Sequence, residues 1–299
     1  MPAAIIAIFV LTIFYLWFGF TVPVKPQANN LLLSRSYDAP ARILSKQPIT
    51  IKAVSAVAFE TDSRARIFNQ NGDEVRSIAS LTKLMSAIVF LNTKPGWNKE
   101  VVIEQGDLQT GSKANIFVGD RINLKDLFNA SLIASDNTAM TALIRSTGLS
   151  EKEFVALMNQ TAKDLRLGTM TFSDPTGLDI NNQGTAVDVV RLAEQAFSYE
   201  AISSALKLPV YSFKVSPQLS RQVFSTNQLI GRKLPLGAKM LIGKTGHINE
   251  AGYCFTGIFE YRGKKIITAV LGAPLDENRF SETLRILDWT LKAYLWDNN

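Results

Sequence analysis

The sequence predicts an α/β fold of the α+β type, in which helices flank an antiparallel sheet and an all-helical subdomain is inserted. Three observations support this prediction. Strand-like segments stand near both ends of the globular part, helix-like segments fill its middle, and an amphipathic helix closes the chain. Because a sheet and a helix each bury an apolar face against a neighbour, the simplest packing joins both groups of strands into one sheet.

The expected elements follow from the spacing of the apolar residues. Alternating apolar positions predict strands, and apolar positions that recur every three or four residues predict helices. The strands are expected at residues 51–59, 65–69, 210–229, 239–244, 252–260 and 265–271. The helices are expected at residues 81–91, 124–134, 138–146, 151–165, 185–199 and 280–296. Ser150 is the expected N-cap of the fourth helix.

The chain divides into three parts. Residues 3–24 carry no charge and are rich in Ile, Leu, Phe and Trp, and about 20 such residues span a bilayer core. We therefore predict that residues 1–24 form a membrane anchor, with a signal segment as the alternative. Residues 25–47 are polar and aperiodic, which indicates a linker. Residues 48–299 form the globular domain, with enough apolar residues for a sizeable core.

The charge balance and the rare residues exclude several classes of function. The formal net charge is +6, but the basic residues are scattered, so we expect no nucleic-acid partner. The only cysteine is Cys254 and the only histidine is His247. One residue of each kind cannot form the usual zinc site, and we expect neither a metal nor a cofactor. They also exclude a Ser-His-Asp triad unless His247 is its base.

Three short motifs occur in order along the globular domain. They are Ser80-Leu81-Thr82-Lys83, Ser135-Asp136-Asn137 and Lys244-Thr245-Gly246. Each is weak alone, because the chain also contains Ser204-Ala205-Leu206-Lys207 and Ser225-Thr226-Asn227. Context separates the two Ser-x-x-Lys matches. Ser80 opens an apolar helix whose first turn places it on the same face as Lys83, whereas Ser204 stands near the end of a helix.

The joint occurrence of these motifs resembles the penicillin-binding protein and serine β-lactamase superfamily. Within it, the chain resembles the low-molecular-weight D-alanyl-D-alanine carboxypeptidases of peptidase family S11. The resemblance covers about residues 48–296, and further family-like text occurs at residues 172–178 and 251–253. It implies a β-lactamase-like fold and a hydrolase that acts on the D-alanyl-D-alanine ends of peptidoglycan stem peptides. β-Lactams would be its covalent inhibitors.

The resemblance assigns catalytic roles to four residues. Ser80 would attack the carbonyl of the penultimate D-alanine, and Lys83 would take the serine proton. Ser135 would relay a proton to the leaving nitrogen, and Asn137 would hold a substrate amide and orient Lys83. A neutral Lys83 amine would be favoured by burial and by a neighbouring cation such as Lys244.

The resemblance assigns substrate binding to residues on a late strand. Lys244 would supply positive potential, Thr245 would hydrogen-bond a carboxylate or carbonyl, and Gly246 would leave room for the substrate along the strand edge. The backbone N–H groups of Ser80 and His247 would form the oxyanion hole.

Arg279 and Asp136 each have two interpretations. Arg279 stands where the family places an arginine near the terminal carboxylate, a role that suits a bidentate guanidinium. The alternative is a surface arginine that caps the last helix. Asp136 is expected to orient its loop rather than to act as a catalytic acid.

The exact reaction and the location stay open. Carboxypeptidase activity is the preferred prediction. D,D-endopeptidase activity on cross-links is the alternative, since the chain resembles single-domain members of the family, some of which are endopeptidases. A class A β-lactamase would need a Glu-x-x-Leu-Asn segment, which we do not find, and the intact motifs disfavour a non-enzymatic β-lactam sensor. The chemistry predicts a place on the extracytoplasmic face of the bacterial cytoplasmic membrane, or export if the N-terminal segment is cleaved.

Overall fold

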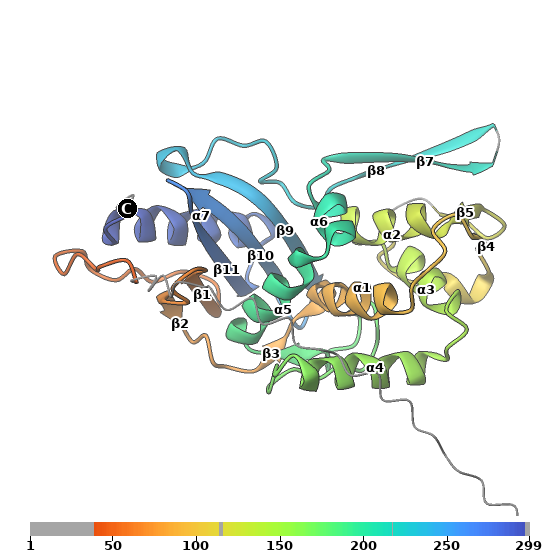
Figure 1. Cartoon of the computed structure of the whole chain (residues 1–299), viewed down its shortest axis with the longest axis horizontal. Helices are drawn as coiled ribbons and strands as arrows, with labels where there is room; N and C mark the ends of the chain where they lie inside the picture. The colour runs from red at the N-terminus through yellow and green to blue at the C-terminus, as the bar shows by residue number, and fades with distance from the viewer. Residues whose placement is uncertain (1–38, 114–115, 217, 297–299) are drawn as a thin grey trace, which may run out of the picture. The chain divides into compact units, whose positions relative to one another are not determined.

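A computed structural model describes residues 39–113, 116–216 and 218–296 of the chain. The predicted membrane segment and most of the predicted linker lie outside these residues. The described part contains a five-stranded antiparallel sheet in the order β2–β1–β11–β10–β9 (Figure 1). Its strands are β1 (Ser55–Glu60), β2 (Arg66–Gln70), β9 (Lys239–Ile248), β10 (Gly252–Tyr261) and β11 (Lys264–Ala273). The first two strands thus join the last three in one sheet, as the sequence predicts.

The sheet is buried on both faces, and the period of two along each strand divides its side chains between two cores. On β1, Ala56 and Ala58 belong to one apolar cluster, and Val57 between them belongs to the other. Helix α7 (Asp276–Ala293) covers the first face with Phe280 and Ile286. Helix α5 (Ala186–Ser198) packs against the opposite face.

The remaining helices form the inserted helical part that the sequence predicts (Figure 1). They are α1 (Thr82–Asn92), α2 (Leu124–Ile133), α3 (Asn137–Arg145), α4 (Glu151–Asp164) and α6 (Glu200–Leu206). Side chains cap several of these helices, which explains where they begin. Ser150 and Glu153 form the capping box of α4, so the predicted N-cap is confirmed.

Short elements connect the helices to the sheet. They are β3 (Arg76–Ser77), β4 (Glu100–Val102), β5 (Arg121–Asn123), β6 (Gln183–Gly184) and three 3₁₀ turns, η1 (Ala79–Leu81), η2 (Gln105–Asp107) and η3 (Pro235–Gly237). β3 pairs with β6, and β4 pairs with β5. These elements set the paths of the loops around the motifs.

Residues 210–229 are not a strand of the sheet, and this expectation is wrong. They contain a separate hairpin of β7 (Val210–Ser216) and β8 (Leu219–Phe224), which lies beside α2 (Figure 1). Phe213, Val215 and Val223 point into the core of the helical part. The hairpin therefore buries its alternate side chains against helices, and the alternating pattern alone cannot distinguish this from burial against a sheet.

Among the described residues, no helix has the length and apolar character needed to cross a membrane. The predicted anchor at residues 1–24 lies outside the described part and stays a prediction.

Candidate active site

Ser80 lies on the 3₁₀ turn η1, directly before α1, and not inside the helix itself. The Nζ atom of Lys83 lies 3.0 Å from Ser80 Oγ, as the shared helical face predicts. The neighbouring Ala79 has a φ of +48°, in the left-handed region that L-residues rarely adopt. Gly177 allows the chain to pack directly against this turn, since a Cβ on this glycine would lie 2.2 Å from the Ala79 carbonyl oxygen.

Lys83 is fully buried and touches three oxygen atoms. Its Nζ lies 2.6 Å from Asn137 Oδ1 and 2.5 Å from the Thr176 carbonyl oxygen, in addition to Ser80 Oγ. Burial lowers the pKa of Lys83 to about 7, although Asp174 and Asp136 oppose this shift. A neutral amine has two N–H donors and one lone pair. The two donors suit the amide and carbonyl oxygens, and the lone pair is left for the hydroxyl proton of Ser80.

The side-chain amide of Asn137 is fixed in the orientation that this geometry needs. Its Nδ2 donates to the Thr110 carbonyl oxygen at 2.7 Å, so Oδ1 faces Lys83. Asp136 caps α3 by accepting from the Ala139 N–H at 2.8 Å, and its other oxygen accepts from the Lys113 N–H at 2.6 Å. The expectation that Asp136 orients the loop is confirmed by these contacts.

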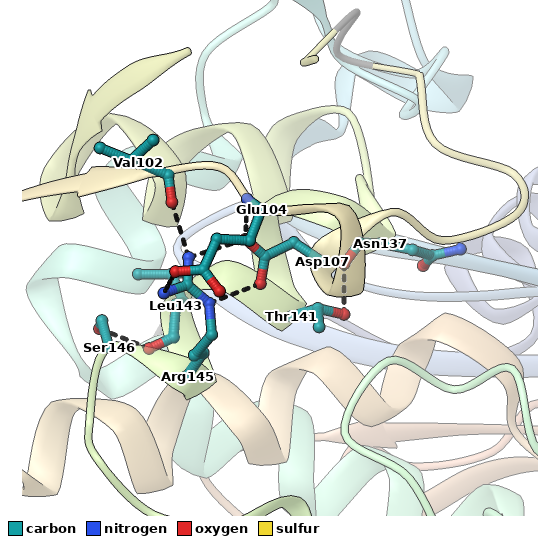
Figure 2. Close-up of polar contacts among 8 residues, drawn as sticks. All are labelled: Val102, Glu104, Asp107, Asn137, Thr141, Leu143, Arg145 and Ser146. Atoms are coloured by element: carbon teal, nitrogen blue, oxygen red, sulfur yellow. Dashed lines mark hydrogen bonds and ion pairs between the residues drawn. The ribbon is translucent and has the colours of Figure 1, made fainter. Parts of the chain in front are cut away.

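An arginine on α3 ties the helix to the segment that leads to Thr110 (Figure 2). Arg145 donates from Nε and Nη2 to the two carboxylate oxygens of Asp107, each at 2.8 Å, and from Nη1 to Glu104. The Asp107 side chain is only 1% exposed, so Arg145 neutralises a buried charge. The network fixes the segment whose carbonyl holds Asn137.

Lys244, the second buried lysine of the site, lies on β9. Its Nζ donates to Ser135 Oγ at 2.7 Å and to the Thr245 carbonyl oxygen at 2.9 Å. Burial lowers the pKa of Lys244 well below its usual value, with further contributions from Lys83 and Arg279. Because Lys83 contributes to this shift, the two buried amines repel each other when both are charged, which favours the loss of one proton from the pair.

β9 lies directly against the nucleophile turn. A Cβ on Gly246 would lie 3.0 Å from the Ile78 carbonyl oxygen and 3.2 Å from the Ser80 nitrogen. Only a glycine permits this approach without a shift of the turn. The backbone of Ser80 and the edge of β9 thus form one wall of the site, where the oxyanion hole is expected.

Arg279 is buried on the first turn of α7, so its interpretation as a surface arginine is wrong. Its side chain is 8% exposed, donates to the Gly246 carbonyl oxygen at 3.1 Å and pairs with Asp276. The guanidinium also lies over the Tyr253 ring, 5.4 Å from its centroid. The His247 ring stacks on the same tyrosine, with 3.9 Å between centroids.

Lys83, and not the His247 side chain, makes the contact with Ser80 that a base needs. Burial and Arg279 lower the pKa of His247, and in the described part of the chain the hydrogen bond of Ser80 Oγ is with Lys83. The structure thus favours the lysine as the base.

The predicted residues gather around one cavity of about 320 Å³. Its walls include Ser80, Ser135, Asn137, Thr245, Gly246, His247 and Arg279, with Lys83 and Lys244 hydrogen-bonded to Ser80 and Ser135. Among the described residues, no group of three or more His, Cys, Asp or Glu side chains could hold a metal ion.

Several residues of the cavity have no role in the sequence-based interpretation. They include Lys113, Leu178, Thr226, Tyr253 and Asp276. The Oγ1 atoms of Thr226 and Thr245 are 2.5 Å apart. Thr226 is the middle residue of the second Ser-x-Asn match, so that segment lies at the site although its pattern assigns it no role there.

The segment at residues 172–178 forms the floor beneath Lys83. Asp174 accepts hydrogen bonds from the N–H groups of Thr176, Gly177 and Asp179 at 2.5, 2.9 and 2.6 Å. Burial opposes ionisation of Asp174, but its hydrogen bonds dominate and lower its pKa. The charged carboxylate folds this segment so that the Thr176 carbonyl faces the amine of Lys83.

A family model described as D-alanyl-D-alanine carboxypeptidase matches residues 42–275. The D-alanyl-D-alanine endopeptidase of Haemophilus influenzae is 30% identical over 77% of this chain and 78% of that protein. The endopeptidase of Escherichia coli is 27% identical over 94% of this chain and 88% of that protein. The D-alanyl-D-alanine carboxypeptidase DacF of Bacillus subtilis is 28% identical over 81% of this chain, which spans 63% of that relative.

Solved structures of similar proteins share the fold. Penicillin-binding protein D2 of Listeria monocytogenes, in its cefotaxime-bound form, aligns with a TM-score of 0.70 and 28% identity. The alignment covers 82% of this chain and 100% of that one. A point mutant of the Streptomyces K15 DD-transpeptidase aligns with a TM-score of 0.74 and 25% identity, over 82% of this chain and 99% of that one.

Proposed function

Since this chain belongs to the D-alanyl-D-alanine carboxypeptidase family, peptidase family S11, we propose that it is a serine-type D,D-carboxypeptidase of peptidoglycan stem peptides. The observation that carries this proposal is the contact of 3.0 Å between Ser80 Oγ and the buried amine of Lys83. A serine hydroxyl beside an amine whose pKa is about 7 is an activated nucleophile.

Acylation follows from the contacts around Ser80. Lys83 takes the hydroxyl proton while Ser80 Oγ attacks the carbonyl of the penultimate D-alanine. The oxygen of that carbonyl becomes negative and is stabilised by the backbone N–H groups of Ser80 and His247. The proton reaches the leaving nitrogen through Ser135, which Lys244 holds at 2.7 Å. Water then hydrolyses the ester and restores the Ser80 hydroxyl.

Binding of the substrate carboxylate is proposed at the cationic end of the cavity. Arg279 and Lys244 supply positive charge there, and Thr245 offers a hydroxyl. Arg279 has a buried Nε atom that no protein group in the described residues satisfies. The rest of the guanidinium is held by Asp276 and by the Gly246 carbonyl oxygen, which fixes the cation at the wall of the cavity.

The direct test is release of D-alanine from a peptide that ends in D-alanyl-D-alanine. We expect the native protein to release it and the Ser80→Ala variant to release none above background. Ser204→Ala is the matched control, because Ser204 belongs to the other Ser-x-x-Lys segment, and it should keep the native rate. Equal rates for the native protein and Ser80→Ala would refute the mechanism.

D,D-endopeptidase activity on cross-links is the second candidate. It is favoured by the relatives in Haemophilus influenzae and Escherichia coli, both named D-alanyl-D-alanine endopeptidases. Both reactions proceed through the same acyl-enzyme, so the nucleophile and base keep their roles.

A β-lactam would act as a covalent inhibitor of Ser80 rather than as a rapidly hydrolysed substrate. The glutamates between the second and third motifs include Glu153, which caps α4, and Glu194, which faces Arg64 at 3.5 Å. Neither lines the cavity, so neither is placed to activate a deacylating water.

We further propose that residues 1–24 hold the domain at the extracytoplasmic face of the cytoplasmic membrane. The support is their uncharged apolar sequence and the extracytoplasmic location of peptidoglycan. Fractionation of cells that produce the full chain should place it with the membranes, and deletion of residues 1–24 should abolish this. A full chain found only in the cytosol would refute the proposal.

A further inference from the structure

The strands of the five-stranded sheet connect two ends of the domain that differ in chemistry. Gly246 and His247, near the end of β9, line the catalytic cavity. The same strand begins at Lys239. Since a strand rises about 3.3 Å per residue, Lys239 lies roughly 25 Å from His247. The start of β9 therefore belongs to an end of the sheet that is remote from the cavity.

Two further segments reach this remote end of the sheet. The turn between β10 and β11 lies beside the start of β9, because Glu260 pairs with Lys239. Helix α7 begins beside the cavity, where Arg279 lines the wall, and runs back across the sheet (Figure 1). Beyond the end of α7, Trp296 contacts Tyr261 of the turn, with 6.3 Å between the ring centroids.

The described chain also enters the domain at this end. The Ile43 N–H donates to the Ala293 carbonyl oxygen at 2.8 Å, and the Leu295 N–H donates to the Ala41 carbonyl oxygen at 2.9 Å. Residues 25–38 precede this part of the chain and can span at most about 50 Å. A membrane held by the segment proposed above would thus lie within reach. We use the name distal end for Lys239 together with residues 41–46, 260–265 and 288–296.

Basic side chains dominate the distal end. Its acidic residues are Glu260 and Asp288, and Asp288 pairs with Lys292 at 2.8 Å. The neighbouring β1–β2 turn adds one charge of each sign, Asp62 and Arg64. A surplus of positive charge attracts an anionic surface over about 10 Å at about 0.1 M salt. The exposed basic residues of the distal end are Arg42, Lys46, Lys239, Arg262, Lys265 and Lys292.

Apolar and aromatic side chains lie among these charges. Leu44 is 87% exposed and Leu295 is 51% exposed. The rings of Tyr261 and Tyr294 both contact Trp296. Lysine, arginine, tyrosine and leucine side chains together suit the surface of a bilayer, where charged headgroups meet apolar acyl chains. A soluble anion or a polysaccharide would neutralise the charges but would leave the leucines in water.

We propose that the distal end docks on a bilayer of anionic phospholipid and that this contact turns the catalytic cavity away from the membrane. The proposal rests on the membrane segment proposed above, but not on the chemistry at Ser80. The basic side chains bind phospholipid phosphates, and Leu44 and Leu295 enter the boundary between headgroups and acyl chains. The cavity, at the other end of the sheet, then faces the peptidoglycan.

The test places the full chain in lipid nanodiscs with an environment-sensitive fluorophore attached at Leu44→Cys. The natural Cys254 is buried and stays unlabelled. In nanodiscs that contain phosphatidylglycerol, the emission should shift to shorter wavelength, because the label enters the bilayer surface. In nanodiscs of phosphatidylcholine alone it should not shift. The same label at Leu157→Cys, on α4, should give one emission in both lipids.

Charge variants show whether the distal end makes the contact. The distal variant combines Lys46→Gln, Lys265→Gln and Lys292→Gln. We expect it to lower the ratio of docked to undocked protein about a hundredfold, since each basic side chain near an anionic surface contributes to binding. Salt at about 0.5 M should undock the native chain in the same way.

The matched control removes the same charge from the helical part. It combines Lys125→Gln, Lys152→Gln and Lys163→Gln, which are exposed lysines of α2 and α4. This control should dock as the native chain does. Both triple variants should release D-alanine from a soluble peptide at the native rate, since none of the six lysines lines the cavity.

Three results would overturn the docking proposal and leave the carboxypeptidase intact. The first is one emission from Leu44→Cys in both lipids, in a chain that inserts and releases D-alanine. The second is an equal loss of docking in both triple variants, because total charge would then control the contact. The third is a distal variant that keeps the emission shift but loses binding to purified peptidoglycan, which would assign this surface to the wall polymer.

The membrane segment and the docking surface fail separately. A chain that does not insert into nanodiscs, but whose label still responds to vesicles of phosphatidylglycerol, would overturn the membrane segment and support docking. A chain that neither inserts nor responds to these vesicles would overturn both. Loss of D-alanine release in the native chain would refute the carboxypeptidase alone.

Discussion

Lys83 is the residue whose environment most directly controls the reaction. Its amine is buried among the oxygens of Ser80, Asn137 and Thr176, and burial is the largest cause of its lowered pKa. The sequence-based interpretation expected both burial and a cation beside it. That cation is Lys244, whose own pKa is lowered first by burial and then by Lys83, while the carboxylates of Asp174 and Asp136 raise the pKa of Lys83.

The acylation rate should therefore depend on pH through Lys83. Above about pH 7 the amine is largely neutral and accepts the serine proton. Below its pKa it is protonated, so the rate should fall about tenfold for each further pH unit. Acylation by a chromogenic β-lactam, measured from pH 5 to 10, checks this. An acidic limb centred near pH 10, the value of a free lysine, would contradict the prediction.

Arg279 should matter for substrates with a free carboxylate. Arg279→Met removes the cation and leaves a carboxylate without a partner, so kcat/KM on a D-alanyl-D-alanine peptide should fall about tenfold to hundredfold. The same peptide with an amidated C-terminus is the control, and its lower native rate should change little. Similar losses on both peptides would indicate that Arg279 acts only by holding the Gly246 carbonyl.

Sequence patterns predict residues of the site unevenly. The three motifs name Ser80, Ser135 and Lys244, because each role needs one kind of side chain at one spacing. Thr226 and Asp276 carry no such signal, since many residue types could line that wall. They join the site only through the path of the chain after β8 and the start of α7.

At the scale of elements, the nucleophile turn depends on the segment that carries Gly177. Gly177 and Gly148 both have positive φ values, +86° and +80°, but only Gly177 has backbone atoms within 4 Å of an added Cβ. Gly148→Ala should cost about 1 kcal/mol of unfolding free energy from strain alone. Gly177→Ala should cost about 1–3 kcal/mol more from overpacking and should slow acylation. Denaturant unfolding measures the loss of stability in each variant, and the rate of acylation by penicillin measures the effect on Ser80. Equal losses of unfolding free energy for Gly148→Ala and Gly177→Ala would contradict this role of Gly177.

The Arg145 network should couple stability to catalysis. Arg145→Met leaves the buried Asp107 charge without its partner (Figure 2), which should cost about 3 kcal/mol of unfolding free energy. The rate of acylation at Ser80 should also fall, because the segment whose carbonyl holds Asn137 becomes less rigid. Lys292→Met is the control: its exposed pair with Asp288 should be worth about 0.5 kcal/mol. A stability loss for Arg145→Met no larger than for Lys292→Met would contradict this role.

The sequence predicts whether a segment is a helix or a strand more reliably than it predicts which neighbours that segment packs against. The amphipathic pattern predicts that α7 begins at residue 280, but the helix begins at Asp276. The first turn is polar, so it carries no apolar pattern, although it lies against the site. Likewise, alternation predicts strands at residues 210–229, but nothing in that pattern tells a hairpin on helices from a strand in the sheet. Burial by tertiary neighbours decides both cases.

On the scale of the whole molecule, the catalytic residues come from distant parts of the chain. Ser80 and Lys83 stand at the start of α1, Ser135 and Asn137 at the start of α3, and Lys244 on an edge strand of the sheet. The sequence predicts this arrangement only through its family resemblance, since periodicity does not say which loop meets which strand. The sheet and the helical part must pack together for the site to exist.

The most direct test of the central claim is mass spectrometry of the protein after exposure to penicillin. We expect one stable adduct with the mass of one penicillin, located on the peptide that contains Ser80. We expect no adduct on the Ser80→Ala variant and the native adduct on the Ser204→Ala variant. An adduct on another residue, or none at all on the folded native protein, would contradict the assignment of Ser80 as the nucleophile.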